Sequence, residues 1–197
     1  MIFVQPKPGK KMKRIERDFI TLFNCLWYQD FPVEVDAVTN RAGWTIHVGL
    51  VMRQCAKLLG ARAYFEQSGR TDAVLRFPDK SVLSHVEWEW DEPHNKKVEE
   101  ITKLLNQREP AAFATFVSYS SIDHLPAAIE KASRLWAEAS KPLIFFIVTF
   151  EQVGRDRHFL ELQTHFFSRG KHKKIRSQPA LPWQINRARF NNVDEDK

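Results

Sequence analysis

The chain has 197 residues, is 43% hydrophobic and 12% aromatic, and carries a formal net charge of +6. This composition excludes a disordered protein, and the length suits a single domain over residues 1–197 with one substantial core. The longest apolar run, Leu143–Phe150, is too short to cross a bilayer, and the first residues lack a signal-peptide pattern. We therefore expect a cytoplasmic protein with no membrane partner. The cysteines, Cys25 and Cys55, lie in apolar helical patterns and are expected to be reduced core thiols.

The first half of the chain predicts two helices followed by three strands. Residues 1–11, rich in lysine and proline, are expected to form a flexible basic arm. Apolar residues at three- and four-residue steps predict helices over about 15–26 and 42–59. Strands are predicted at 61–67, 74–77 and 82–90, joined by turns at 68–70 and 78–81.

The second half alternates helices with strands. A helix is predicted over 96–106, a strand over 111–119, and a long helix between Asp123 and Lys141. Two further strands are predicted at 143–150 and 158–167, and residues 169–197 then form a basic C-terminal segment. The order of these elements predicts an α/β fold with a mixed central β-sheet flanked by helices.

Acidic residues gather on one face of the hairpin between Thr71 and Asp91. Strand partners around a tight turn have a constant index sum, which places Asp72 opposite Glu87 and Glu66 opposite Asp72. Glu89 projects from the same face as Glu87. A divalent cation such as Mg²⁺ or Mn²⁺ would remove the repulsion between these carboxylates. Spacing alone also allows a solvated acidic face with no ligand.

The order α-β-β-β-α-β-α-β, with an acid on the second strand and an acid-x-acid pair on the third, resembles the PD-(D/E)XK nuclease superfamily. The resemblance implies a restriction-endonuclease-like fold with a nuclease-like core over residues 42–150. It makes Asp72, Glu87 and Glu89 the catalytic residues and Asp72, Glu87 and Glu66 the metal ligands. Pro78-Asp79, a literal match to the first part of the motif, is set aside because it lies in the predicted hairpin turn.

Glu89 departs from the family pattern, because it stands where the family has lysine. A glutamate there could act as general base or as a further metal ligand. Lys96 and Lys97, at the start of the next helix, could supply the missing positive charge. The departure also leaves open a family member that binds its target without cutting it.

The resemblance implies a metal-dependent nuclease that hydrolyses phosphodiester bonds in DNA, with Mg²⁺ or Mn²⁺ as cofactor and a homodimer left open. Six basic side chains near the chain ends are expected to bind nucleic-acid phosphates: Lys10, Lys11, Lys171, Lys173, Lys174 and Arg176. Such basic runs are also typical of solvated tails. Two alternative functions remain open, a non-catalytic nucleic-acid-binding protein and a protein-interaction protein on the same fold.

Overall fold

A single seven-stranded sheet organises the structure, a computed structural model that describes residues 12–32, 41–66, 71–154 and 156–185. The helices are α1 (Arg14–Leu26), α2 (Arg41–Leu58), α3 (Glu100–Leu105) and α4 (Leu125–Leu135). The strands are β1 (Arg62–Phe65), β2 (Ala73–Arg76), β3 (Val82–Glu89), β4 (Ala111–Ser121), β5 (Leu143–Val153), β6 (Asp156–Ser168) and β7 (Lys171–Pro179). The basic arm predicted for 1–11, with Lys10 and Lys11, and the turn predicted at 68–70 lie outside the described residues.

The strands lie in the sheet in the order in which they occur in the chain. β1, β2 and β3 are antiparallel neighbours, whereas β3, β4 and β5 run parallel to one another. The parallel pairs are connected through α3 and α4, as parallel neighbours require. β5, β6 and β7 complete the sheet as antiparallel neighbours. The prediction of a mixed α/β sheet flanked by helices is confirmed.

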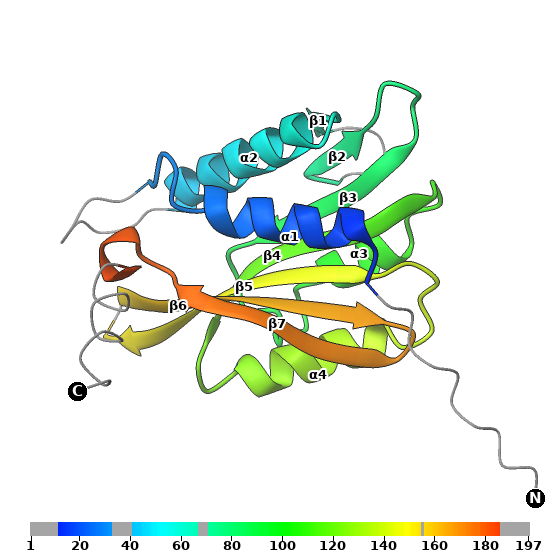
Figure 1. The fold of residues 1–197 in the computed structure, drawn as a ribbon. Helices are drawn as coiled ribbons and strands as arrows, with labels where there is room; N and C mark the ends of the chain where they lie inside the picture. Colours follow the sequence, from blue (N-terminus) through cyan, green and yellow to red (C-terminus); the bar gives the residue numbers. More distant parts are fainter. Residues whose placement is uncertain (1–11, 33–40, 67–70, 155, 186–197) are drawn as a thin grey trace, which may run out of the picture.

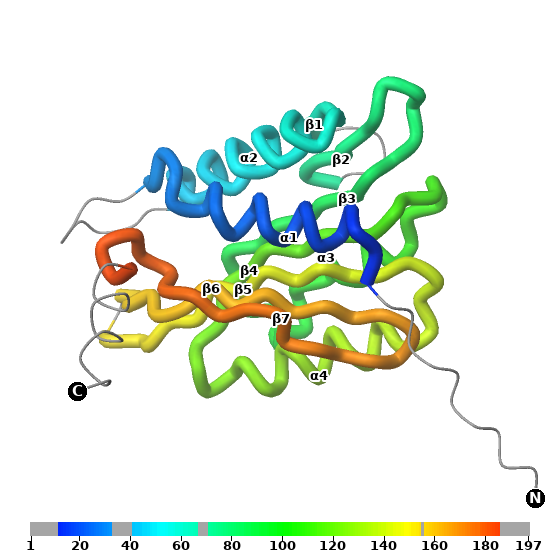
Figure 2. The backbone as a smooth tube through the Cα atoms, in the orientation of Figure 1, coloured from blue at the N-terminus to red at the C-terminus, as the bar shows by residue number. Residues whose placement is uncertain are grey.

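Helices cover both faces of the sheet, and Figures 1 and 2 show α1 and α2 on one side and α4 on the other. Alternate side chains of β5 divide between two cores. Phe146 belongs to the core under α1 and α2, where its ring stacks on Phe23 with 3.7 Å between centroids. Phe145 belongs to the opposite core under α3 and α4. β5 is therefore the doubly covered central strand that its apolar run predicts. No helix among the described residues is both long and apolar enough to span a membrane.

The pairing registers of the hairpin agree with the predicted index sums. Ala73 pairs with Val86 across β2 and β3, so one further step places Asp72 opposite Glu87. Phe65 pairs with Ala73 across β1 and β2, and the next backbone amide, that of Glu66, donates to the Asp72 carbonyl at 3.1 Å. The alignment of the acids along the sheet is therefore confirmed at the level of the backbone.

The basic C-terminal segment contains a strand that was not predicted, β7, which forms an edge of the sheet. A two-residue turn leads into it, with Arg169 and Gly170 at φ values of 51° and 71°. Such left-handed pairs match the twist of a β-hairpin. The sequence of β7 does not predict a strand, because its side chains show little apolar alternation. Its lysine-rich composition is typical of edge strands, where charge opposes pairing with another chain.

Two further predictions need correction. α3 begins at Glu100, whereas a helix was predicted from Lys96, because residues 96 and 97 form a turn and residues 98 and 99 are irregular. Cys55 is a buried free thiol as expected, but Cys25 is exposed on α1 and is not a core residue.

Candidate functional site

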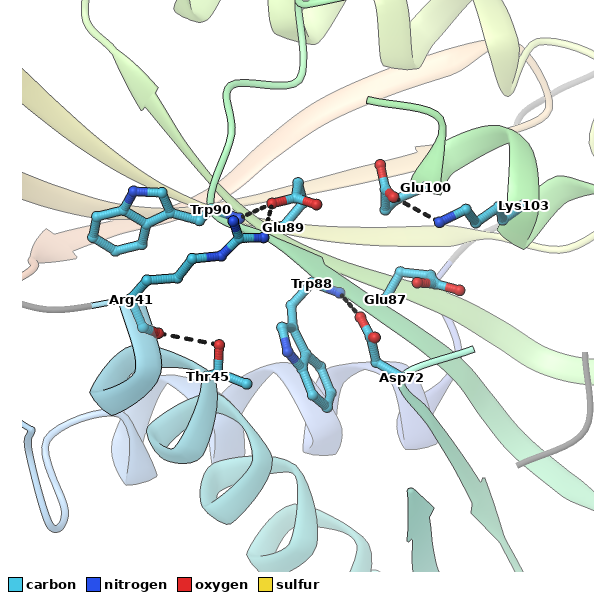
Figure 3. Close-up of a pocket in the computed structure, with 9 residues that line it drawn as sticks. All are labelled: Arg41, Thr45, Asp72, Glu87, Trp88, Glu89, Trp90, Glu100 and Lys103. Atoms are coloured by element: carbon cyan, nitrogen blue, oxygen red, sulfur yellow. Dashed lines mark hydrogen bonds and ion pairs between the residues drawn. The ribbon is translucent and has the colours of Figure 1, made fainter. Parts of the chain in front are cut away.

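A pocket of about 280 Å³ opens beside the carboxyl-terminal half of β3, and its polar side chains come from three parts of the fold (Figure 3). Its lining includes four acids and two bases: Asp72, Glu87, Glu89 and Glu100 with Arg41 and Lys103. Trp88 and Trp90, which alternate with the acids along β3, join the apolar core on the side of α1 and α2. The alternation of β3 therefore supplies the carboxylates and anchors the strand at the same time.

Asp72 and Glu87 form the centre of the pocket. The Asp72 carboxylate accepts a hydrogen bond from the backbone amide of Trp88, with 2.7 Å between Oδ2 and N. Glu87 is only 2% exposed, and its Oε1 atom has no hydrogen-bond partner among the described residues. A buried carboxylate oxygen without a donor costs free energy, about 1–3 kcal/mol or more when charged, unless a ligand satisfies it.

Burial changes the protonation of this pair. Desolvation, followed by the nearby charge of Asp72, raises the pKa of Glu87 to about 8. Desolvation also raises the pKa of Asp72, although the Trp88 amide opposes that shift. At neutral pH the pair therefore holds a proton that two exposed acids would have lost, as expected for like charges placed side by side.

Glu100 and Lys103 add a second polar group to the pocket from α3. The Lys103 ammonium donates to Glu100 Oε1 at 2.8 Å, and this interaction raises the pKa of Lys103. Glu100 is 8% exposed, and its other oxygen, Oε2, has no hydrogen-bond partner in the described structure. The pocket therefore contains two buried carboxylate oxygens that lack donors, one from Glu87 and one from Glu100.

Glu89 makes different contacts from the other acids. Its Oε1 atom accepts hydrogen bonds from Arg41 Nη2 at 3.1 Å and from the backbone amides of Trp90 and Asp91 at 2.7 and 3.1 Å. These contacts fix the carboxylate and hold the guanidinium of Arg41 at the rim of the pocket (Figure 3). The role of Glu89 as general base or metal ligand stays a prediction. Its observed contacts hold the Arg41 guanidinium in position.

Other predicted residues lie away from the pocket. The Glu66 side chain is exposed and does not line it, although the Glu66 backbone pairs with Asp72. Lys96 and Lys97 are exposed and do not line the pocket. The lysine that places a positive charge beside the acids is Lys103. Asp79 lies in the hairpin turn, as predicted, where its carboxylate accepts from the Ser81 amide at 2.9 Å.

The basic residues expected to bind nucleic acid are spread along an edge strand. Lys171, Lys173, Lys174 and Arg176 are all exposed on β7. Lys10 and Lys11 lie outside the described residues. Contact of these side chains with a nucleic acid, and the homodimer, stay predictions that the structure does not test.

Arg41, Glu100 and Lys103 were not recognised from the sequence as pocket residues. Glu100 and Lys103 are three residues apart on the helix that follows β3, so they share one helix face. A crossover helix between parallel strands starts near the carboxyl end of the first strand, and this rule could have indicated both residues. Arg41 offered no such signal, because α2 precedes the hairpin by many residues and is placed by packing alone.

Comparisons with known proteins give no family for the chain. No model of a protein family matches it, and no curated protein matches it. A carbon-nitrogen hydrolase from Helicobacter pylori G27 is similar in structure at a TM-score of 0.43 and 10% identity, covering 92% of this chain and 89% of that one. The YaeQ protein from Xanthomonas axonopodis pv. citri has a TM-score of 0.30 and 12% identity, covering 68% of this chain and 79% of that one. Likenesses this distant do not transfer an activity.

The identification with the PD-(D/E)XK nuclease superfamily is wrong. No model of that superfamily, or of any other family, matches the chain. The prediction of a metal-dependent DNA nuclease is therefore wrong, and the comparisons give no support for DNA binding. The resemblance was carried by three acids and the order of elements, and both features recur in α/β sheets with unrelated functions.

Proposed function

We propose that the pocket binds a divalent cation, Mg²⁺ or Mn²⁺, through Asp72 and Glu87 and uses it in the hydrolysis of a small anionic substrate. One observation carries the proposal. Glu87 Oε1 is buried, has no hydrogen-bond donor within the described residues, and belongs to a carboxylate that lies beside Asp72. A cation bound between the two acids would satisfy that oxygen and offset their repulsion.

The chemistry of the lining favours a hard cation. Its candidate ligands are carboxylate oxygens, with no cysteine or histidine among the residues that line the pocket. Mg²⁺ is commonly held by one or two carboxylates, and water and substrate complete its coordination shell. Asp72 and Glu87 supply two carboxylates, and Glu100 Oε2 is a third acceptor available to a bound water.

The bases of the pocket indicate an anionic substrate. Arg41 is fixed by Glu89, and Lys103 is fixed by Glu100, so both cations are held at the pocket. A guanidinium presents paired donors that suit carboxylate and phosphate groups. The volume of about 280 Å³ lies just below the range of roughly 300–1,000 Å³ for small-molecule sites, so the substrate would be small.

A hydrolytic reaction uses these groups in complementary ways. A divalent cation held by Asp72 and Glu87 would acidify water and polarise a substrate oxygen. Glu100 would accept a proton from the attacking water through Oε2 and return it to the leaving group as the ester bond breaks, while Arg41 would orient the anionic end of the substrate. Glu89 acts through Arg41 as a positioning residue.

Calorimetric titration with Mn²⁺ and Mg²⁺ tests the cation site. We expect one site in the wild type, and we expect Asp72→Asn and Glu87→Gln each to lose it. Glu66→Gln, which changes an exposed acid outside the pocket, is the matched control and should bind like the wild type. Because Glu87 is protonated at neutral pH, binding should release a proton, detectable as heats that differ between buffers of different ionisation enthalpy. Equal affinity in all four proteins would overturn the proposal.

The hydrolytic step is tested separately. Chromogenic phosphate and carboxylate esters of small acids are incubated with the wild type and Mn²⁺, and product is followed with and without EDTA. Arg41→Ala should raise KM with little change in Mn²⁺ affinity, because Arg41 is assigned to the substrate. If the protein binds metal but hydrolyses none of the esters, its function is cation binding and the proposed hydrolytic activity is wrong.

A further inference from the structure

A second group of metal-ligating side chains lies beyond the pocket, at the carboxyl ends of two parallel strands. Glu92 and His94 follow β3, and His124 follows β4 immediately before α4. One ligand atom from each of the three side chains lies within 4.8 Å of the others. No other group of three such atoms meets this criterion in the described parts of the chain.

We propose that Glu92, His94 and His124 form a binding site for a first-row transition-metal cation of the Zn²⁺ class. The distance between Glu92 Oε2 and His124 Nδ1 is 3.1 Å, and that between Glu92 Oε2 and His94 Nδ1 is 3.7 Å. Ligand atoms that hold Zn²⁺ at about 2.0–2.1 Å in a tetrahedron are roughly 3.3 Å apart. The two observed separations lie on either side of that value.

The Nδ1 atom of His94 has no hydrogen-bond partner among the described residues, and it is shielded from solvent. Glu92 Oε2 is 3.7 Å from this nitrogen, which is too long for a hydrogen bond. The His94 and His124 rings lie 4.0 Å apart between centroids, so a cation would bind two imidazoles that already lie side by side.

The surrounding structure orients the carboxylate. The Ser121 backbone amide donates to Glu92 Oε2 at 2.9 Å, and this contact fixes the orientation of that side chain. The Ser121 hydroxyl lies 2.9 Å from His124 Nδ1 and would turn away when a metal takes that nitrogen. Imidazole nitrogen with one carboxylate selects Zn²⁺ and its neighbours over Mg²⁺, so this site and the carboxylate pocket would take different ions.

Three protein ligands leave one position open in a tetrahedral site. Structural zinc sites are closed by four protein ligands, whereas sites that bind a water or a small molecule keep one position free. The metal would therefore hold a water or a small-molecule ligand in the fourth position.

Absorption spectroscopy with Co²⁺, and calorimetry with Zn²⁺, test this site on the full chain, prepared without a histidine tag and freed of metal with a chelator. We expect one Zn²⁺ per chain and a visible Co²⁺ band of the intensity typical of four- or five-coordinate sites. His94→Ala and His124→Ala should each weaken Zn²⁺ binding by at least about 100-fold. His172→Ala removes a different histidine pair, His165 with His172 on β6 and β7, and should leave binding unchanged.

A second variant covers the possibility that alanine perturbs the fold. His94→Cys supplies a thiolate ligand and should retain Zn²⁺ while adding a sulfur-to-Co²⁺ charge-transfer band. Glu87→Gln should not change the Zn²⁺ stoichiometry, so failure of this site can be told from failure of the carboxylate pocket. A Co²⁺ spectrum identical to that of the aqueous ion, or Zn²⁺ binding that survives both alanine substitutions, would overturn the proposal.

Discussion

Asp72 lies opposite Glu87 across the β2–β3 pair, and Glu87 is buried with one carboxylate oxygen lacking a donor. Two acids in this relationship favour a bound proton or a bound cation. The choice between them depends on pH, because the pKa of Glu87 is raised from 4.5 to about 8.

The first prediction concerns stability against pH. The raised pKa means that the folded state binds a proton that the unfolded state has lost, so the contribution of Glu87 is complete below pH 4.5 and disappears as the pH rises towards 8. Asp72 acts in the same direction. We expect Glu87→Gln and the wild type to have the same melting temperature near pH 4.5, and the variant to melt roughly 10–20 °C higher near pH 9.

Thermal melts by circular dichroism across this pH range measure the difference. Adding Mn²⁺ near pH 9 should stabilise the wild type and leave Glu87→Gln unchanged, since the amide is a poor ligand. A melting difference between the two proteins that is the same at every pH would contradict the assigned pKa shift.

The second prediction concerns the loop that carries Glu92 and His94. The Lys131 ammonium on α4 donates to the backbone carbonyls of Pro93, Asn95 and Val98 at 2.8, 2.8 and 2.9 Å. Lys131→Met keeps the aliphatic stem but removes three donors, each typically worth about 1.5–3 kcal/mol when charged. We expect faster proteolysis within residues 92–99 and roughly 10-fold weaker Zn²⁺ binding.

Limited proteolysis with mass spectrometry, together with Zn²⁺ titration, checks this result. Arg134→Met is the control, because Arg134 is exposed on the same helix. Lys131→Met that matches the control in both measurements would show that the carbonyls do not depend on this ammonium.

The third prediction concerns the larger core. Phe23 is 0% exposed, and its ring stacks on Phe146 at 3.7 Å between centroids and 18° between planes. Phe23→Ala should lower the free energy of unfolding by about 3–5 kcal/mol, measured by urea denaturation. Ile46→Ala, at a position that is 64% exposed, should change it by no more than about 0.5 kcal/mol. A small loss at Phe23 would mean that α1 is not packed as described.

The fourth prediction concerns the exposed edge of the sheet. Lys171 and Lys173 lie two residues apart on β7, where charged side chains oppose pairing with a second chain. Replacing both by valine should produce self-association that increases with concentration in analytical ultracentrifugation. Replacing both by glutamate should not, because either sign of charge protects the edge. Association of the glutamate variant would instead indicate that the positive sign itself matters.

Patterns along the chain were enough to predict most of the local structure. Helical periodicity and alternation placed four helices and six of the seven strands, and constant index sums around tight turns placed Asp72 opposite Glu87. These features depend on neighbours along the chain, so a pattern of residues is enough to predict them. β7 was not predicted because it lies at an exposed edge of the sheet. Its charged side chains lack the apolar alternation by which the other strands were recognised.

Contacts between distant parts of the chain, and the burial of each side chain, depend on how the elements pack. Glu92 and His94 meet His124 because β3 and β4 pair in parallel, a register fixed by packing through α3 and not by any turn. Glu100 reaches the pocket through the same crossover, and Arg41 reaches it through the packing of α2. Burial of Glu87, which gives that acid its unusual pKa, likewise depends on surfaces brought together from distant parts of the chain.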